Sequence, residues 1–201
     1  MDAEIDAIYT YWFGDLLTNP DAESRNELWF MGGQTVDNEI RERFGPLVER
    51  ALAGELDAWT DTPRGSTALI ILLDQFPLNI YRGQARAFDG EQRAVDVCLA
   101  GIAAGQDQTL SFDERAFFYL PLEHSEHDEH QELSVRYFTQ LLEDAPAHKK
   151  EGAQYTLQYA IDHKAIVDQF GRYPHRNRVL GRASTEEELA YLADGGATYG
   201  Q

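Results

Sequence analysis

Apolar residues recur three or four positions apart over most of the chain, which is the spacing of an amphipathic helix. Such stripes predict helices over residues 3–17, 36–53, 91–104, 128–143 and 152–170. Pro46 lies inside the second stripe. Because proline lacks a backbone donor, we expect it to divide that stripe into two short helices.

The run "STALIILLDQF" is apolar on every side from Ala68 to Leu73. A run this short fits a buried strand as well as a buried helix. We predict a helix, because Thr62 and Pro63 suit an N-cap and a first helical position. A strand would also lack a second strand to pair with.

Helix-capping signals predict further helices towards the C-terminus. Capping boxes are expected at Ser111–Glu114 and at Ser184–Glu187, and the final "GGATYGQ" is expected to fray. Together these patterns predict an all-α fold of antiparallel helical layers without a sheet. The length of 201 residues fits one domain spanning residues 1–201.

The charge balance is strongly acidic, with 17 basic and 35 acidic residues and a net charge of -18. Such a surface repels phosphate backbones and anionic lipid, so we expect neither a nucleic-acid partner nor a membrane partner. A single cysteine, Cys98, excludes an intramolecular disulfide and a multi-cysteine metal site. The acidic start, and the lack of an apolar run of about 18 residues, predict a soluble cytoplasmic protein.

Asp74 directly follows the apolar run, so we expect it to be buried at a helix end. A negative charge there is disfavoured by desolvation and by the helix dipole, and needs a cation or several donors. Arg82, or an arginine of "GRYPHRN", is the expected partner. Two interpretations stay open: a structural ion pair that fixes the turn, and a carboxylate kept in a cleft for catalysis or recognition.

Arginine is concentrated in three loops of this acidic chain, which has fourteen Arg and three Lys. The residues concerned are Arg64, Arg82, Arg86, Arg172, Arg176, Arg178 and Arg182. Guanidinium groups bind carboxylate or phosphate in a bidentate manner, so converging loops would form a positive pocket for a small anion or a peptide carboxylate. Alternatively, these arginines neutralise the excess carboxylates in a salt-bridge network.

The histidines at residues 124, 127 and 130 attract attention in "EHSEHDEHQ". Steps of three residues spread side chains over roughly 120° of a helix, a poor geometry for three metal ligands, so we predict no metal site. His127 and His130 are expected to be solvated at a helix start. His124 follows "AFFYLPL" and is expected to lie against the core.

His163 lies beside an aromatic stripe, and His175 lies inside an arginine-rich loop. Alone, each is more often a hydrogen-bonded structural histidine. If the segments meet, these two and His124 form an acid–base or metal cluster with Glu126, Asp162 and Asp74.

Three blocks carry a resemblance: "TPRGSTALIILLDQFPLNIYRGQARAF", "ERAFFYLPLEHSE" and "FGRYPHRNRVLGRASTEEE". They resemble an uncharacterised bacterial family, number 924 in the domain-of-unknown-function series, over nearly the whole chain. The resemblance implies a tetratricopeptide-like all-α fold, a stack of antiparallel helical hairpins, and it implies no activity. Leu78 stands where the family usually has arginine, and His127 and His130 fall outside the family pattern.

Three functional hypotheses follow. The first is a module that binds a small anionic molecule or a peptide carboxylate. Its candidate ligand-binding residues are Arg64, Asp74, Asn79, Arg82, His163, Arg172, Arg176 and Asn177. The second is a hydrolase or lyase in which His124 or His175 is the general base and Glu126 or Asp74 orients it. The third is a purely structural scaffold. The sequence identifies no cofactor.

Overall fold

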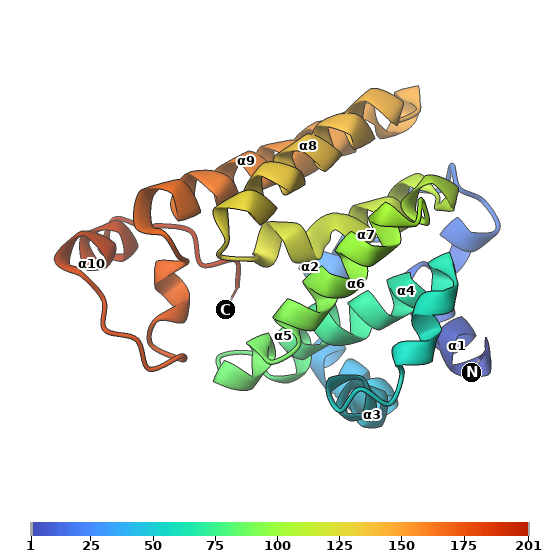
Figure 1. The fold of residues 1–201 in the computed structure, drawn as a ribbon, viewed down its shortest axis with the longest axis horizontal. Coiled ribbons are helices and arrows are strands. Elements are labelled where there is room, and N and C mark those ends of the chain that lie inside the picture. Colours follow the sequence, from blue (N-terminus) through green and yellow to red (C-terminus); the bar gives the residue numbers. More distant parts are fainter. Residues whose placement is uncertain (1, 201) are drawn as a thin grey trace.

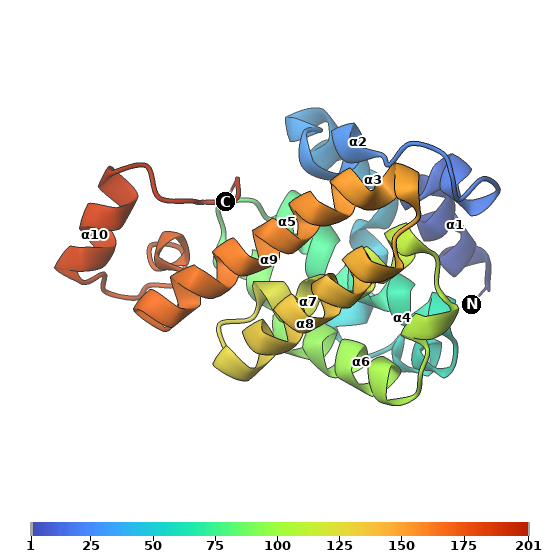
Figure 2. The same cartoon turned by 90° about the horizontal axis from the view of Figure 1, so that it is seen from above.

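The computed structural model describes residues 2–200 (Figures 1 and 2). Within that range the backbone forms helices, turns and loops and no strand, so the predicted all-α fold is confirmed. The α-helices are α1 (Asp2–Trp12), α2 (Asn26–Phe30), α3 (Gly33–Leu52), α4 (Pro63–Ile70), α5 (Phe76–Ile80), α6 (Glu91–Ala103), α7 (Phe112–His124), α8 (Asp128–Asp144), α9 (Lys150–Phe170) and α10 (Glu186–Ala193).

Helix α7 occupies the middle of the molecule. It packs against α4 and α6 on one side and against α8 and α9 on the other (Figure 1). Helices α8 and α9 form a long antiparallel pair, and α10 lies beyond the C-terminal end of α9 (Figures 1 and 2). This pair is one helical hairpin; the tetratricopeptide-like stacking of several hairpins stays a prediction.

Aromatic side chains from four helices meet in the core. Trp12 of α1, Trp29 of α2, Phe76 of α5 and Phe117 of α7 are all buried. The ring centroids of Trp29 and Phe117 lie 4.8 Å apart in an edge-to-face arrangement, which aromatic quadrupoles favour. These contacts hold the short helix α2 opposite α7, across the entrance to the site described below.

Helix α3 runs without a break through Pro46, so the expected division into two helices is wrong. Its buried residues Ile40, Phe44 and Val48 recur every four positions on both sides of the proline. Packing of this stripe favours one continuous helix, although the proline costs one backbone hydrogen bond.

The predicted helix through Ala68–Leu73 is confirmed, but it widens before it ends. After α4 comes a π-helical turn, Ile71–Gln75, in which the amide of Phe76 donates to the carbonyl of Ile71. Pro77 follows, and in a regular helix its ring would clash with the carbonyl of Leu73. Gly90 approaches that carbonyl so closely that a Cβ would lie 2.2 Å from the oxygen. The widened turn therefore carries Asp74 into the site.

Two expectations near the C-terminus are wrong. The capping box of α10 is formed by Thr185 and Glu188, one residue later than expected, because the Ser184 hydroxyl bonds Asn177 instead. The tail is not frayed up to residue 200. The ring of Tyr199 stacks on another ring of the site, and the carbonyl of Gly200 accepts a hydrogen bond from Arg82. The capping box at Ser111–Glu114 is confirmed.

The structure also bears on the environment of the single cysteine and on whether a helix could cross a membrane. Cys98 of α6 is fully buried, and burial raises the pKa of its thiol, which suits a structural residue. Among the helices of residues 2–200, none has both the length and the apolar character needed to cross a bilayer.

Candidate functional site

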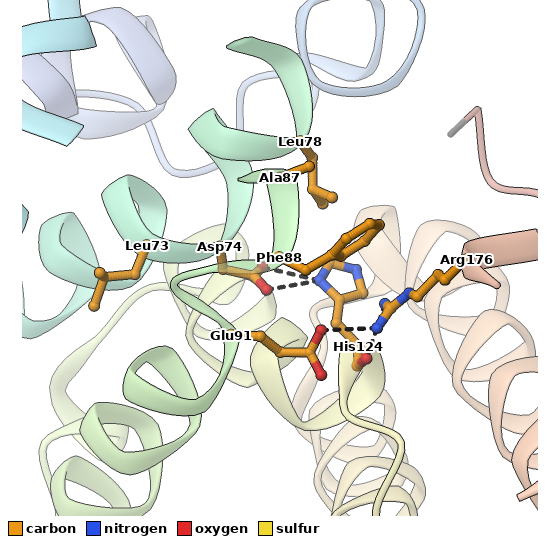
Figure 3. A pocket seen from close by; sticks show the side chains of 8 residues that line it. All are labelled: Leu73, Asp74, Leu78, Ala87, Phe88, Glu91, His124 and Arg176. Carbon is orange, nitrogen blue, oxygen red and sulfur yellow. Dashed lines mark hydrogen bonds and ion pairs between the residues drawn. The ribbon is translucent and has the colours of Figure 1, made fainter. Parts of the chain in front are cut away.

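A hydrogen-bonded pair, Asp74 and His124, forms the centre of the site (Figure 3). Asp74 comes from the π-turn, and His124 is the last residue of α7. Nδ1 of His124 lies 2.8 Å from Oδ1 and 3.0 Å from Oδ2 of Asp74, and the other ring nitrogen points away from the carboxylate. The amide of Gln75 donates to Oδ2 at 2.5 Å. The partners of Asp74 are therefore His124 and Gln75, and not the arginine that the sequence suggested.

The environment of His124 favours its protonated form. Burial lowers the pKa of the imidazole, but the charge of Asp74 and its hydrogen bond raise it, and the net shift is upwards. Because Nδ1 is held by Asp74, Nε2 is the nitrogen left to bond a ligand or to exchange a proton. The pair thus presents one oriented, exchangeable N–H at the end of a helix.

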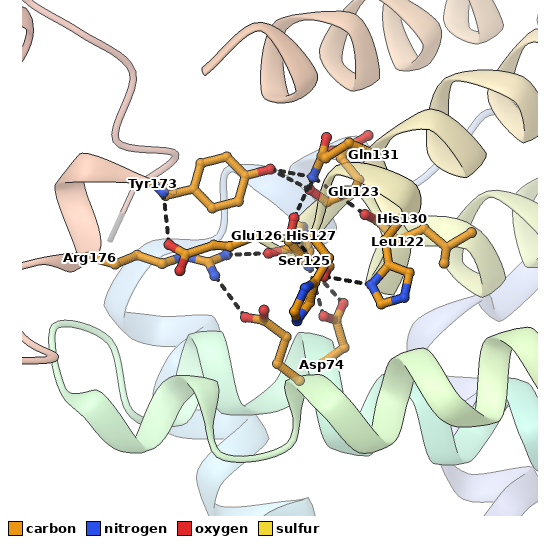
Figure 4. Close-up of polar contacts among 12 residues, drawn as sticks. Asp74, Leu122, Glu123, Ser125, Glu126, His127, His130, Gln131, Tyr173 and Arg176 are labelled. Carbon is orange, nitrogen blue, oxygen red and sulfur yellow. Dashed lines mark hydrogen bonds and ion pairs between the residues drawn. The ribbon is translucent and has the colours of Figure 1, made fainter. Parts of the chain in front are cut away.

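Side chains from two other elements cap the C-terminal end of α7 (Figure 4). The amide of Gln131 donates to the carbonyls of Glu123 and Ser125 at 2.7 and 2.6 Å. The hydroxyl of Tyr173 donates to the carbonyl of Glu123 at 2.5 Å. Helix ends leave carbonyls without partners, and these groups satisfy them while fixing the backbone next to His124.

Arg176 joins the loop after α9 to the helix end. One terminal nitrogen donates to the carbonyl of His124 at 2.9 Å, and the other bonds Glu91 at 2.7 Å. Its guanidinium carbon lies 4.5 Å from the ring centroids of both Phe88 and Tyr173, a double cation–π contact. A positive charge at a helix C-terminus is also favourable.

A small cavity of about 10 Å³ lies between this guanidinium and the Asp74–His124 pair (Figure 3). It has room for about one water molecule and polar groups to hold it. Burial raises the pKa of the Glu91 carboxyl on its wall, and the charge of Arg176 opposes that rise.

Glu123 and His163 bring two buried ionisable groups beside the pair. Nδ1 of His163 donates to the carbonyl of Tyr159 at 2.8 Å and lies 3.4 Å from Oε1 of Glu123. Burial raises the pKa of Glu123 to about 7. Burial and the charge of His124 lower the pKa of His163 to about 3. At neutral pH His163 is therefore uncharged and Glu123 is only partly ionised. The ring of Tyr199 stacks on His163 with centroids 3.8 Å apart.

His175 is the third histidine of the site, beside His124 and His163. Burial and the charge of Arg176 lower its pKa to about 4, so it is neutral at physiological pH. Its Nδ1 is buried and has no hydrogen-bond partner within the described part of the chain. The ring lies 5.7 Å from that of Tyr173 and 5.9 Å from that of Tyr199.

These groups line one end of a cleft of about 730 Å³. The cleft receives residues from α2, α5, α7, α9, the loop after α9 and the C-terminal tail. Of the residues proposed from the sequence, it collects Asn79, Arg82, His124, His163, His175 and Arg176. Three loops distant in sequence thus meet at one cleft.

Two predicted ligand-binding groups from the first motif already have a carboxylate partner. Arg82 binds both oxygens of Asp37 at 2.9 Å, and Asn79 donates to the same carboxylate at 2.8 Å. Burial raises the pKa of Asp37, but the hydrogen bonds from Arg82 and Asn79 lower it by more, so the net pKa lies below the usual value. Arg64 lies outside the cleft lining, where it pairs with Asp6 on the surface.

The second motif behaves in the same way. Arg172 binds both oxygens of the buried Glu188, and Asn177 donates to one of them. The hydrogen bonds from Arg172 lower the pKa of Glu188 to about 2. Neither Arg172 nor Asn177 lines the cleft. This part of the arginine set matches the salt-bridge network that the sequence left open.

Glu126 does not orient His124. Its carboxylate binds Arg182 at 2.5 and 2.9 Å and accepts the amide of Tyr173 at 2.8 Å. Burial raises the pKa of this group, and the bonds from Arg182 bring it below its usual value. Glu126 therefore fixes the loop after α9, and Asp74 is the residue that orients the histidine.

The two other histidines of the repeat lie apart from the cleft lining. His127 is exposed at the N-cap of α8, as expected, whereas His130 is half-buried and its Nδ1 lies 2.8 Å from the hydroxyl of Ser125. Within residues 2–200, no group of three His, Cys, Asp or Glu side chains has a geometry that could hold a metal ion.

Several site residues were missed from the sequence. Glu123 precedes His124 on α7, and its signal was an acid embedded in an aromatic helix. Glu91, Gln131 and Tyr199 carried no distinguishing pattern, because their roles depend on contacts between distant segments.

The family and the solved structure to which this chain is similar are both described as being of unknown function. No curated protein matches it. The solved structure of the protein of unknown function ATU0120 from Agrobacterium tumefaciens is similar, with 34% sequence identity over 96% of this chain and 99% of that chain and a TM-score of 0.80. The model of the family described as "Bacterial protein of unknown function (DUF924)" matches residues 8–196. The chain therefore belongs to the family DUF924.

Proposed function

We propose that this protein is a binding module whose cleft holds a small molecule through an anionic group. The observation that carries the proposal is the Asp74–His124 hydrogen bond of 2.8 Å at the wall of the cleft. It leaves Nε2 of a proton-retaining imidazole as a donor, and charge-assisted donors are the strong ones.

The cation of this site is His124, supported by Arg176. Arg82 and Arg172 have their hydrogen-bonding edges turned to carboxylates of the chain, so they hold the walls in place. The tetratricopeptide-like fold, the single domain spanning residues 1–201 and a cytoplasmic location belong to the same proposal. The tetratricopeptide-like fold rests on the resemblance to the family, the single domain on the chain length, and the location on the acidic start and the lack of a long apolar run.

The test uses His124→Asn, because an asparagine amide can donate to Asp74 as Nδ1 does but has no counterpart of Nε2. Thermal shift and calorimetry with a panel of carboxylates and phosphates measure binding. The native chain is expected to bind one class, and the variant to lose at least tenfold in affinity, since a hydrogen bond to a charged group contributes about 1.5–3 kcal/mol. His127→Asn, exposed and outside the cleft lining, is the matched control and should bind normally.

A second candidate, acid–base catalysis by a hydrolase or lyase, is favoured by the same orientation of His124. A carboxylate at Nδ1 fixes which nitrogen carries the exchangeable proton, as general acid–base catalysis requires. Turnover of ester and amide panels distinguishes it: Asp74→Asn should then lose activity by two orders of magnitude or more, roughly the contribution of a positioned acid–base group, while ligand affinity changes far less. Unchanged binding by His124→Asn would contradict the first proposal, and unchanged turnover by Asp74→Asn the second.

A further inference from the structure

The cleft has a second, apolar half that the proposed binding role does not explain. We call it the aromatic arm; its lining includes Trp29, Phe30, Phe112, Phe117, Leu120 and Tyr155. Its lining comes from α2, α7 and α9, and it belongs to the same cleft as His124, His163 and Arg176. A small inorganic anion would leave this half of the cleft empty.

Along both α7 and α9, the side chains that line the cleft on one helix face change from apolar to ionisable towards the C-terminal end. Asp113, which is ion-paired with Lys149, also lines the cleft beside Phe112. On one face of each helix, the lining residues of α7 are Phe112, Ala116, Leu120 and His124, and those of α9 are Tyr155, Tyr159 and His163. Members of each set are four positions apart, so they share one helix face. The two helices run in the same direction (Figures 1 and 2), so both gradients end at the same place.

The spacing gives the length of the arm. From Tyr155 to His163 a helix advances about 12 Å, and from Phe112 to His124 about 18 Å. That is the reach of a medium-length extended chain, with one end among apolar rings and the other among the ionisable groups.

Three large apolar side chains that border the arm are exposed. Phe30 is 67% exposed, Met31 is 76% exposed and Tyr155 is 64% exposed. These residues border the same cleft. Clustered exposed apolar residues mark binding surfaces more often than isolated ones do.

The other end of the cleft contains buried polar atoms without partners. Oε2 of Glu123 and Nε of Arg176 are closed to solvent and have no hydrogen bond within residues 2–200, and both residues are more than nine-tenths buried, so a ligand reaches these two atoms only if the side chains turn towards the cleft. Such atoms are costly in a folded protein unless something bonds them. A ligand carboxylate would accept hydrogen bonds from Nε2 of His124 and from the guanidinium of Arg176.

From this polarity we infer that the ligand is a straight-chain aliphatic carboxylate, with its carboxylate at His124 and Arg176 and its chain in the aromatic arm. The inference deepens the proposed function and rests on it for the position of the carboxylate. The arm itself is a separate observation.

The experiment is titration calorimetry of the native chain with butanoate, hexanoate, octanoate, decanoate and dodecanoate, all below the concentration at which they form micelles. Affinity is expected to rise about tenfold for each added pair of methylenes until the arm is filled, because each buried methylene contributes about 0.8 kcal/mol. The matching alcohols should bind at least tenfold more weakly.

A variant that fills the arm tests the position of the chain. Gly152 lines the cleft, and a Cβ placed on it meets no atom within 4 Å, so Gly152→Trp should leave the fold intact and occupy the arm. It should weaken dodecanoate at least tenfold and leave butanoate unchanged. Ile161→Ser, at an exposed residue of α9 outside the cleft lining, is the control. Melting temperatures verify folding.

The outcomes separate the two proposals. Affinity independent of chain length, with His124→Asn still weakening short carboxylates, would overturn the aliphatic ligand and keep the anion site. A chain-length dependence that His124→Asn does not affect would overturn the anion site. Absence of binding across the whole series would overturn the aliphatic ligand, and the anion site would then stand or fall on the wider panel of carboxylates and phosphates.

Discussion

At the residue scale, the chemistry of the site depends on which buried groups carry charge. Glu123 is 4% exposed and sits beside His163, whose Nδ1 is occupied by a backbone carbonyl. Nothing close to Glu123 compensates its desolvation fully, because the imidazolium of His124 is shared with Asp74. Burial thus raises the pKa of Glu123 while Asp74 raises that of the neighbouring His124, so two acid–base groups with shifted pKa values lie side by side in one cleft.

Glu123 should make stability depend on pH. Its pKa rises from 4.5 to about 7 on folding, so the native state binds more protons than the unfolded state between these values. The stability that neutral Glu123 contributes is complete below pH 4.5 and is lost as the pH rises through 7, by an amount on the order of 3 kcal/mol. Urea unfolding should show the native chain losing stability relative to Glu123→Gln between pH 5 and pH 8.

The control for this experiment is Glu42→Gln, which changes the same chemical group on the exposed face of α3. Its stability relative to the native chain should not vary over that interval. A difference between the native chain and Glu123→Gln that stays constant with pH would show that Glu123 is ionised in the folded protein.

At the scale of elements, the apolar stripes predicted most helices and their approximate limits. Periodicity succeeds there because each stripe faces a single core, as in α8 and α9. Periodicity fails where contacts between segments distant in sequence determine the backbone geometry. The π-turn depends on Gly90 approaching the carbonyl of Leu73, and continuity of α3 through Pro46 depends on packing across the proline. Neither contact leaves a local signature.

Site prediction divides in the same way. His124, Asp74 and His175 were identified because their residue types are unusual in apolar or arginine-rich surroundings. Their partners were not, since the pairing of Asp74 with His124 spans 50 residues and that of Arg176 with Glu91 spans 85. The arginines suggested an anion pocket because their carboxylate partners, including Asp37, come from segments without any motif.

The start of α10 offers a test at this scale, because sequence and structure place the capping residue differently. The hydroxyl of Thr185 accepts the amide of Glu188, whereas the Ser184 hydroxyl accepts from Asn177, which also bonds Glu188. Thr185→Ala should lower the free energy of unfolding by about 1 kcal/mol, the usual contribution of an N-cap. Ser184→Ala should cost less than half of that in the same urea titration. The reverse order would place the cap at Ser184.

At the scale of the whole molecule, the net charge of -18 is set against a few buried or half-buried ion pairs. Many other pairs, such as Arg43–Glu39 and Arg64–Asp6, are well exposed and contribute little each. Repulsion among the unpaired carboxylates should therefore outweigh attraction within the surface pairs.

This balance predicts that salt stabilises the protein. Raising sodium chloride shortens the screening length from about 30 Å at 0.01 M to about 8 Å at 0.15 M, which weakens long-range repulsion more than contacts between adjacent charges. At pH 7 the urea midpoint should rise over this interval and then level off. At pH 4.5, close to the isoelectric point of about 4.5, the net charge is near zero and the rise should vanish. A midpoint that falls with salt at pH 7 would mean that the ion pairs, including those that hold the cleft walls, dominate the electrostatics of the fold.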